Sequence, residues 1–202
     1  RVPRKIASLN GIPVRYSRLF DSKDLVPDYE NPNVVGLNNH VDEGDSVTII
    51  GGGWGVTGVI AARQAGDAGD VTIYEASSEY ANHVRETAIL AGVANRISVI
   101  ERAVGEGVFI FGEDDTDQYS PADIPECDLL EIDAEGAEID ILTEITVRPE
   151  TIIVETHGCY AAPTAQVELL LEQRGYEVIS KKAELADRGV DVLVAKYLLS
   201  SD

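Results

Sequence analysis

Residues 47–58 read VTIIGGGWGVTG, and this stretch decides the fold. An apolar run stops at three consecutive glycines, and Trp54 and a fourth glycine follow. The pattern is typical of a buried strand that turns directly into a helix. Glycines at such a turn leave out side chains, so that the backbone can approach a ligand closely, and they permit positive φ angles. The stretch therefore predicts either a ligand-binding turn or a tight turn that serves only helix packing.

Strand-like and helix-like segments alternate from this turn onward. Apolar strands are expected at residues 47–50, 70–75, 96–104, 127–133 and 150–158, and helices at residues 56–66, 77–93, 134–145 and 164–176. Such alternation predicts a parallel sheet that is covered on both faces. Two further strand-like runs, at 176–182 and 191–199, have no helix between them, so the last strand should run antiparallel. We predict an α/β fold with a doubly wound, mostly parallel, seven-stranded sheet, an antiparallel C-terminal strand and helices on both faces.

The first 41 residues lack this alternation. Asn10-Gly11, between short strand-like flanks, predicts a hairpin, and a loop and a short helix are expected to follow it. We therefore divide the chain into an N-terminal extension, residues 1–41, and a main domain, residues 42–202.

Charge is the unusual feature of the composition. The chain has 36 Asp and Glu residues against 16 Lys and Arg residues, for a formal net charge of −20, and the acids are spread along its whole length. At ~1 M salt the screening length falls to about 3 Å, so that repulsion between surface acids largely disappears. The balance predicts a halophilic protein, with an ordinary acidic protein as the alternative. Nucleic acid is not an expected partner, because affinity for it depends on basic contacts to phosphate.

The remaining composition predicts a cytoplasmic location. No apolar run approaches the length that would cross a bilayer, so no membrane partner is expected. Cys127 and Cys159 lie far apart and form neither a metal-ligand spacing nor a disulfide framework, which fits a reducing compartment. The oligomeric state is left open.

The second predicted strand ends in Glu75, one strand after the glycine turn. In open parallel sheets, ligands bind beyond the carboxyl ends of the strands, and an acid at this position can accept hydrogen bonds from both hydroxyls of a ribose. A solvated strand end is the alternative. The pair predicts a nucleoside cofactor. Residues 53–58 also match G-x-G-x-x-G, so a nicotinamide dinucleotide competes with S-adenosylmethionine.

Four segments resemble a known family, the FkbM-type group of class I, Rossmann-like S-adenosylmethionine-dependent methyltransferases. The most specific is CDLLEIDAEGAEIDIL, residues 127–142, which resembles that family's D-L-L-K-I-D-x-E-G-x-E segment. EGDSVTIIGGGWG resembles its G-D-x-V-x-D-x-G-A-x-x-G opening, VTIYEAS its F-E-P strand, and IIVETHG its late E-x-H strand. The resemblance covers residues 42–196 and implies that residues 42–202 form a Rossmann-like methyltransferase domain.

Three positions depart from the family pattern. The usual acid on the first strand is Ile49, the Pro after the second-strand acid is Ala76, and the Lys before Ile-Asp is Glu131. The family's acid supports the amino-acid part of the cofactor, so that contact must be absent here or supplied elsewhere. Trp54 is bulky for its place, and it either lines the cleft or packs the turn.

The resemblance implies a role for individual residues at the cofactor. Gly51, Gly53 and Gly55 would approach its methionine part, and Glu75, followed by Ala76, would hold the ribose. Arg102 and Ala103 would flank the adenine, and Asp133 would lie beside the transferred methyl group.

A hydroxyl acceptor must also lose its proton. The candidate bases are Asp133, Glu135, Glu155 and His157. We select Asp133 and His157 as catalytic, since histidine has the best matched pKa and His157 follows a strand's carboxyl end. Asp133 as a helix N-cap, with Glu135 and Glu138 in the first helical turn, is the alternative without catalysis.

A metal site is a weaker alternative at the same strand. Glu155, His157 and Cys159 alternate along one predicted strand face, but three such residues without a fourth partner make a poor metal site. We therefore expect no bound metal.

The expected function is S-adenosylmethionine-dependent methyl transfer to oxygen on a small or glycan-like acceptor, the oxygen being implied by the resemblance alone. Two alternatives remain. One is an NAD(P)-dependent oxidoreductase, but the sequence has no hydride-transfer constellation such as Tyr-x-x-x-Lys. The other is a protein that binds S-adenosylmethionine without catalysis, which the departures from the family pattern at Ile49 and Glu131 favour.

Overall fold

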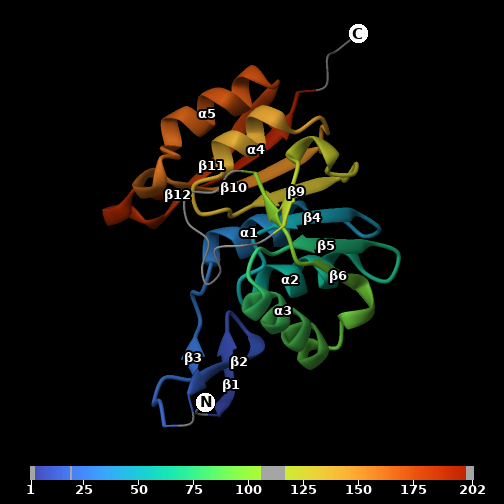
Figure 1. Ribbon diagram of the computed structural model, residues 1–202, viewed down its shortest axis with the longest axis vertical. Coiled ribbons are helices and arrows are strands. Elements are labelled where there is room, and N and C mark those ends of the chain that lie inside the picture. Colours follow the sequence, from blue (N-terminus) through green and yellow to red (C-terminus); the bar gives the residue numbers. More distant parts are fainter. Residues whose placement is uncertain (1–2, 19, 106–116, 199–202) are drawn as a thin grey trace.

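The computed structural model describes residues 3–18, 20–105 and 117–198 (Figure 1). A seven-stranded sheet forms its centre, with the strand order β11-β12-β10-β9-β4-β5-β6. The strands are β4 (Ser46–Ile50), β5 (Asp70–Tyr74), β6 (Ile97–Ile100), β9 (Leu129–Ile132), β10 (Thr151–His157), β11 (Tyr176–Leu185) and β12 (Val190–Tyr197). The predicted doubly wound sheet is therefore confirmed.

Strand direction also follows the prediction. β4, β5, β6, β9 and β10 pair in parallel, whereas β12 pairs antiparallel with both β10 and β11. Residue 199, the last of the predicted terminal strand, lies outside the described residues. Because β4, β5, β9 and β10 run parallel to one another, their carboxyl ends all lie at one edge of the sheet.

Helices cover both faces of the sheet (Figure 1). On one face lie α1 (Asn31–His40), α2 (Val56–Ala65) and α3 (Ser78–Ala91), and on the other lie α4 (Glu138–Glu144) and α5 (Thr164–Gln173). Neighbouring residues of each strand divide between the two cores: Ile49 packs with α1–α3, and Ile50 packs with α4 and α5. Two buried cores on one central sheet give the three-layer architecture that the alternation predicted.

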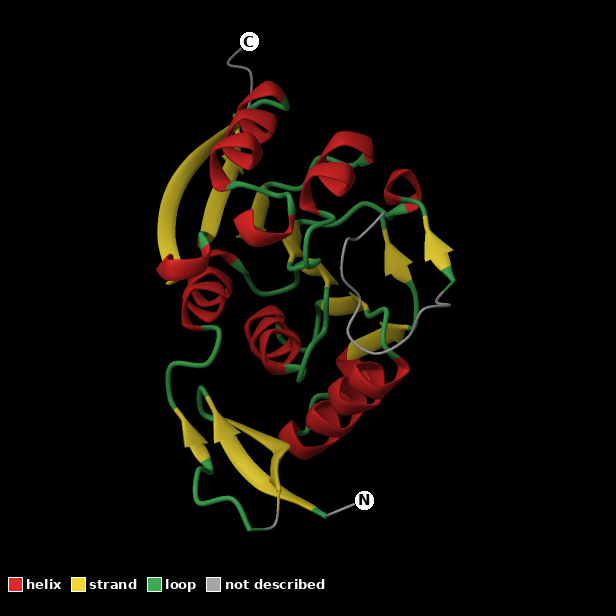
Figure 2. Ribbon diagram, turned by 60° about the vertical axis from the view of Figure 1, so that its left-hand side comes forward, coloured by secondary structure: helices red, strands yellow, loops and turns green. Residues whose placement is uncertain are grey.

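The N-terminal residues form a small separate sheet of β1 (Arg4–Leu9), β2 (Ile12–Arg18) and β3 (Leu25–Val26), which lies at the α3 side of the main sheet (Figure 2). The predicted hairpin is present, with Asn10 and Gly11 both at positive φ, as a tight type I′ turn requires. β3, which pairs parallel with β1, was not predicted. The helix α1 packs against α2 and β10, so it is part of the main domain's outer layer.

Short elements complete the described chain: β7 (Ala103–Val104) pairs with β8 (Gln118–Tyr119), and single 3-10 turns are η1 (Ala94–Arg96), η2 (Pro121–Asp123), η3 (Gly158–Tyr160) and η4 (Ala186–Arg188). None of the helices in the described ranges is long and apolar enough to cross a membrane.

Candidate active site

The glycine turn between β4 and α2 is shaped by close backbone contacts. Gly51 has φ +94°, and a Cβ there would collide with the carbonyl oxygen of Asp133 at the end of the neighbouring strand. Gly53 has φ +48°, and a Cβ there would meet only the Glu30 carboxylate, at 3.7 Å. Gly51 is thus required by strand packing, whereas Gly53 presents bare backbone on an open side.

Gly55 has a different position from the one expected. It is the N-cap residue of α2, and a Cβ at Gly55 would approach the Val84 backbone of α3 to 2.9 Å. It does not line the cavity described below. The structure therefore gives Gly55 a packing role between α2 and α3, whereas Gly51 and Gly53 line the cavity.

Glu75 turns its side chain toward the glycine turn. Its Oε2 accepts hydrogen bonds from the backbone N–H groups of Gly52 and Gly53, at 2.9 and 3.0 Å, and its Oε1 accepts one from the N–H of Ser77, at 2.8 Å. Burial raises the pKa of this carboxyl although these three donors oppose the shift. The end of β5 is thereby fixed against the turn that follows β4.

A cavity of ≈ 250 Å³ opens between these strand ends. Seven of the eight predicted cofactor residues line it: Gly51, Gly53, Glu75, Ala76, Arg102, Ala103 and Asp133. They come from the ends of three neighbouring strands, from the loop after β6 and from the start of β7, segments that are distant in sequence. A pocket at this edge is where doubly wound sheets bind ligands.

Trp54 both lines the cavity and packs the turn. Its ring stacks on His83 with a centroid distance of 4.3 Å, meets Tyr16 and Tyr80 edge-on at 4.9 and 5.6 Å, and lies under the Arg4 guanidinium. Tyr16 and Arg4 belong to the N-terminal sheet. The small sheet is therefore attached to the main domain through the cavity wall.

The residues before α1 also form part of this wall, which the sequence did not indicate. Glu30 lines the cavity in the left-handed conformation, with φ 47°, an uncommon backbone state for a residue other than glycine. Burial raises its pKa to about 8, and the neighbouring carboxylates Glu155 and Glu184 add to the shift. The sequence shows only that an acidic residue, Glu30, directly precedes Asn31-Pro32, where α1 begins.

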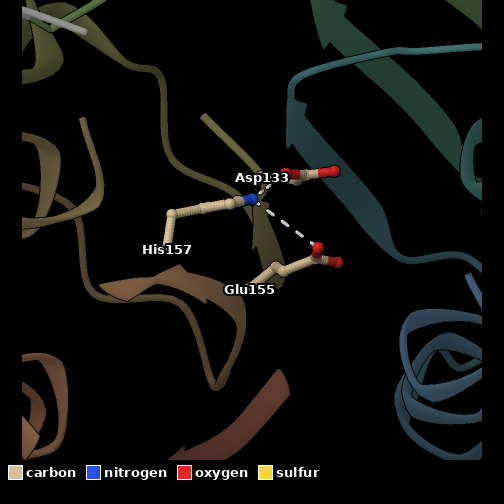
Figure 3. A group of neighbouring side chains, drawn as sticks. All are labelled: Asp133, Glu155 and His157. Atoms are coloured by element: carbon tan, nitrogen blue, oxygen red, sulfur yellow. Dashed lines mark ion pairs between the residues drawn. The ribbon is translucent and has the colours of Figure 1, made fainter. Parts of the chain in front are cut away.

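His157, at the end of β10, lies among four carboxylates. Figure 3 shows two of them, Asp133 and Glu155. Its Nδ1 is 2.8 Å from the Glu138 Oε1, and its Nε2 lies 3.5 Å from Asp133 and 3.6 Å from both Glu135 and Glu155. Burial lowers the pKa of the His157 imidazole, but Glu138, Glu135 and Glu155 together outweigh it, so that the pKa is raised. The structure therefore brings together all four residues that were named as candidate bases.

Helix capping does not explain this cluster. The helix α4 begins at Glu138 and its N-cap is Ala137, so the alternative reading of Asp133 as the N-cap is wrong. Glu138 is in the first helical turn, but its side chain is 0% exposed. It accepts hydrogen bonds from the N–H groups of Ala134 and Gly136 and contacts His157. It fixes the loop after β9 and the imidazole at the same time.

Cys159 does not belong to the cluster. The expected alternation along one strand fails because β10 ends at His157 and a 3-10 turn begins at Gly158, which leaves Cys159 exposed. Among the described residues, metal-ligating atoms within 4.8 Å of one another are instead found on Asp133, Glu155 and His157. Asp133 directly follows β9, the strand next to β10.

Ile49 and Glu131, two of the positions that depart from the family pattern, lie side by side on the neighbouring strands β4 and β9. The two residues are register partners in the β4–β9 pairing, and Glu131 is 2% exposed. Burial, together with Glu30 and Glu155, raises the pKa of the Glu131 carboxyl. The family's acid on β4 is replaced by Ile49, and an acid, Glu131, stands beside it on β9, on the face of the sheet that α1 and α2 cover.

Comparison with known proteins places this chain in a family. A family model described as the methyltransferase FkbM domain matches residues 27–178, three quarters of the chain. The chain belongs to the FkbM methyltransferase family. It is therefore a methyltransferase. A search among curated proteins finds no match.

Solved structures confirm the methyltransferase fold. The ribosomal protein L11 methylase of Lactobacillus delbrueckii subsp. bulgaricus is similar with a TM-score of 0.62 and 14% identity, over 91% of each chain. The S-adenosylmethionine-dependent O-methyltransferase of Thermotoga maritima has a TM-score of 0.56 and 19% identity, over 86% of this chain and 67% of the other. The O-methyltransferase of Bacillus cereus in complex with SAH has a TM-score of 0.55 and 15% identity, over 82% and 80%.

Proposed function

We propose that this FkbM methyltransferase binds S-adenosylmethionine in the cavity at the glycine turn and methylates an oxygen atom of a small or glycan-like acceptor. The observation that carries the proposal is the Glu75 carboxylate, which is held at the cavity rim against bare backbone. Its Oε2 accepts two backbone N–H groups and its Oε1 accepts one. A ribose hydroxyl is the further donor that an acid at this strand end can accept.

The charge of the cavity supports a cationic cofactor. S-adenosylmethionine carries a sulfonium and an ammonium group, whereas its demethylated product has a neutral thioether. Four acidic side chains line the cavity, against one basic residue among the described lining residues, Arg102. They are Glu75, Asp133 and Glu135, together with Glu30, which its pKa of about 8 leaves mostly protonated at neutral pH. Such a wall favours the cofactor over the product and promotes exchange after the reaction.

The acceptor would enter beside Asp133, which lines the cavity and also contacts the His157 Nε2. Bound S-adenosylmethionine supplies an activated methyl group, so the protein has only to orient the acceptor and remove its proton. The Glu138 oxygens accept hydrogen bonds from two backbone N–H groups, and in the proposed tautomer they accept one more from the His157 Nδ1, so that Nε2 is left to take the proton. This assigns positioning to Asp133 and general base catalysis to His157.

Ligand binding tests the cofactor part of the proposal. Melting is measured in high salt with S-adenosylmethionine, with its demethylated product S-adenosylhomocysteine, and with NAD. A ligand at about a hundred times its dissociation constant adds ~2.7 kcal/mol of stability. Stabilisation by the two S-adenosyl compounds supports the proposal, and stabilisation by NAD alone would overturn it.

Methyl transfer tests the acceptor. The protein is incubated with methyl-labelled S-adenosylmethionine and with matched acceptors that differ only in a hydroxyl or an amine. Label on the hydroxyl compounds supports oxygen as acceptor, and label on the amines alone would contradict it.

A further inference from the structure

We infer that the cluster at the end of β9 and β10 is a binding site for a divalent transition-metal ion such as Mn²⁺ or Zn²⁺, with His157 Nε2 and the carboxylates of Asp133 and Glu155 as its ligands. The inference rests on the proposed function, because it assigns the ion to the acceptor side of the same cavity. It replaces the sequence-based expectation of no metal.

Distances within the cluster support shared coordination better than hydrogen bonding. The His157 Nε2 lies 3.5 Å from the Asp133 Oδ1 and 3.6 Å from the Glu155 Oε1, too far for good hydrogen bonds. Atoms that bind one ion at about 2.0–2.2 Å in a tetrahedral arrangement are separated by about 3.3–3.6 Å. Figure 3 shows the imidazole nitrogen between the two carboxylates, as joint ligation requires. The Glu135 Oε2, 3.6 Å from the same nitrogen, borders the open side.

The proposed ligands are held from behind by buried partners. The His157 Nδ1 contacts the fully buried Glu138 at 2.8 Å, an arrangement in which a carboxylate orients the ring and leaves Nε2 for a metal. The Glu155 Oε2 accepts a 2.7 Å hydrogen bond from the Nδ2 of Asn33, which is 1% exposed. These two contacts fix the ligand atoms before any ion binds, and such outer contacts are typical of built metal sites.

Unsatisfied buried oxygens provide an independent indication. The Asp133 Oδ1 and the Asn33 Oδ1 are both buried, and neither has a hydrogen-bond partner within the described residues. A buried oxygen without a donor is costly, and each such atom in a native protein calls for a ligand or a water. The Asp133 Oδ1 lies 3.5 Å from the His157 Nε2. A cation at the cluster would satisfy it.

Ligand chemistry selects the type of ion. One imidazole with two carboxylates suits Zn²⁺, Mn²⁺ or Fe²⁺, whereas Mg²⁺ and Ca²⁺ prefer oxygen ligands alone. Three protein ligands leave a position open, as in catalytic rather than structural sites. Asp133 and Glu135 line the cavity, so this open position faces the place assigned to the acceptor.

The ion would change how the acceptor is activated. An acceptor hydroxyl bound at the open position becomes more acidic. Its O–H bond breaks and the proton passes to a cavity carboxylate that is not a ligand, such as Glu135. The oxygen electron pair then forms the bond to the methyl carbon, and the carbon–sulfur electron pair stays on sulfur as the thioether. His157 is then a ligand and not the general base.

Metal titration tests the inference. The protein is stripped with a chelator, and Mn²⁺ binding is followed by calorimetry and by electron paramagnetic resonance, with Zn²⁺ in parallel. We expect one ion per chain and at least tenfold weaker binding in His157→Ala and Glu155→Gln. Glu138→Gln should weaken binding tenfold or more while every ligand remains. His40→Ala, at the end of α1, is the matched control and should bind like the unaltered protein.

Binding of S-adenosylhomocysteine by the stripped protein separates this inference from the proposed function. If the stripped protein binds S-adenosylhomocysteine but takes up no ion, or if His157→Ala takes up the ion with unchanged affinity, the metal site is wrong and His157 as base remains. If S-adenosylhomocysteine does not bind with or without the ion, the proposed function itself is wrong. Circular dichroism of each variant separates lost folding from lost binding, and Glu138→Gln provides the second, ligand-sparing variant.

Discussion

The Glu75 carboxylate accepts a 2.9 Å hydrogen bond from the backbone N–H of Gly52, across the gap between two neighbouring strand ends. This contact joins the two sequence features that pointed to a nucleoside, the glycine turn and the acid one strand later. It also means that Glu75 orders the turn and borders the cavity at once. The site is therefore preorganised, and a ligand need not pay for ordering this loop.

Gly53→Ala should lose cofactor binding without unfolding. A methyl group at Gly53 extends over the cavity side of the turn, and its positive φ adds strain of about 1 kcal/mol. Gly92→Ala is the matched control, since Gly92 has φ +73° and nothing within 4 Å of an added Cβ. Both variants should melt at similar temperatures, and only Gly53→Ala should bind S-adenosylhomocysteine at least tenfold more weakly in calorimetry. Equal affinity of the two variants would place the cofactor elsewhere.

Trp54 should report cofactor binding directly. It is the only tryptophan of the chain, and its ring lines the cavity. A ligand that enters the cavity changes the surroundings of the indole, so titration with S-adenosylhomocysteine should produce a saturable change in tryptophan fluorescence. The midpoint should agree with calorimetry. A binding curve by calorimetry with no change in fluorescence would mean that the ligand avoids this wall.

Glu30 should make the stability of the ligand-free, chelator-treated protein fall as pH rises. Its pKa is about 8 in the folded state against 4.5 ordinarily, so the folded state holds the proton more tightly than the unfolded state. Between these values unfolding releases the proton, and the free energy of unfolding falls by at most about 1.4 kcal/mol per pH unit. The groups that face Glu30 are Tyr29, Glu131, Asp133, Glu155 and Glu184.

Glu30→Gln is the test of this pH dependence. The neighbouring carboxyls also have raised pKa values, so the variant should show a shallower slope between pH 5 and 8 and not a flat one. Denaturant unfolding at each pH gives the slope. An identical slope in the variant and in the unaltered protein would show that Glu30 is not the titrating group.

The two cysteines should differ in reactivity. Cys127 is buried, and burial raises the pKa of its thiol to about 11, whereas Cys159 is exposed. The thiolate is the reactive form, so a thiol reagent at pH 8 should label Cys159 quickly and Cys127 only after unfolding. Cys159→Ser should abolish the fast phase. Fast labelling of Cys159→Ser would contradict the burial of Cys127, which lies just before β9.

The sequence was sufficient for the fold because local signals agreed with one another. Asn10-Gly11 fixes a hairpin, the glycine turn fixes the first crossover, and Gly66 and Gly92 end α2 and α3. The position of the cavity could be predicted for a related reason. Glu75 directly follows the strand that comes after the glycine turn, and parallel strands end at a common edge of the sheet.

The acid and histidine cluster was harder to predict because its geometry depends on strand order. Asp133 and Glu155 are 22 residues apart, and they meet only because β9 and β10 are neighbours. Cys159 was misplaced because the 3-10 turn after His157 ends the alternation of strand faces. Glu30 enters the cavity through a left-handed backbone, for which the sequence gives no signal.

The most direct test of the account is calorimetric titration of S-adenosylhomocysteine into the unaltered protein, Glu75→Gln and Glu144→Gln. Glu144 is an exposed acid at the end of α4 and serves as a control for lost charge. Charged hydrogen bonds are worth about 1.5–3 kcal/mol each, so Glu75→Gln should bind at least tenfold more weakly while Glu144→Gln is unchanged. Melting of the ligand-free variants shows whether each one folds. A folded Glu75→Gln with full affinity would contradict the central claim that this carboxylate holds the ribose.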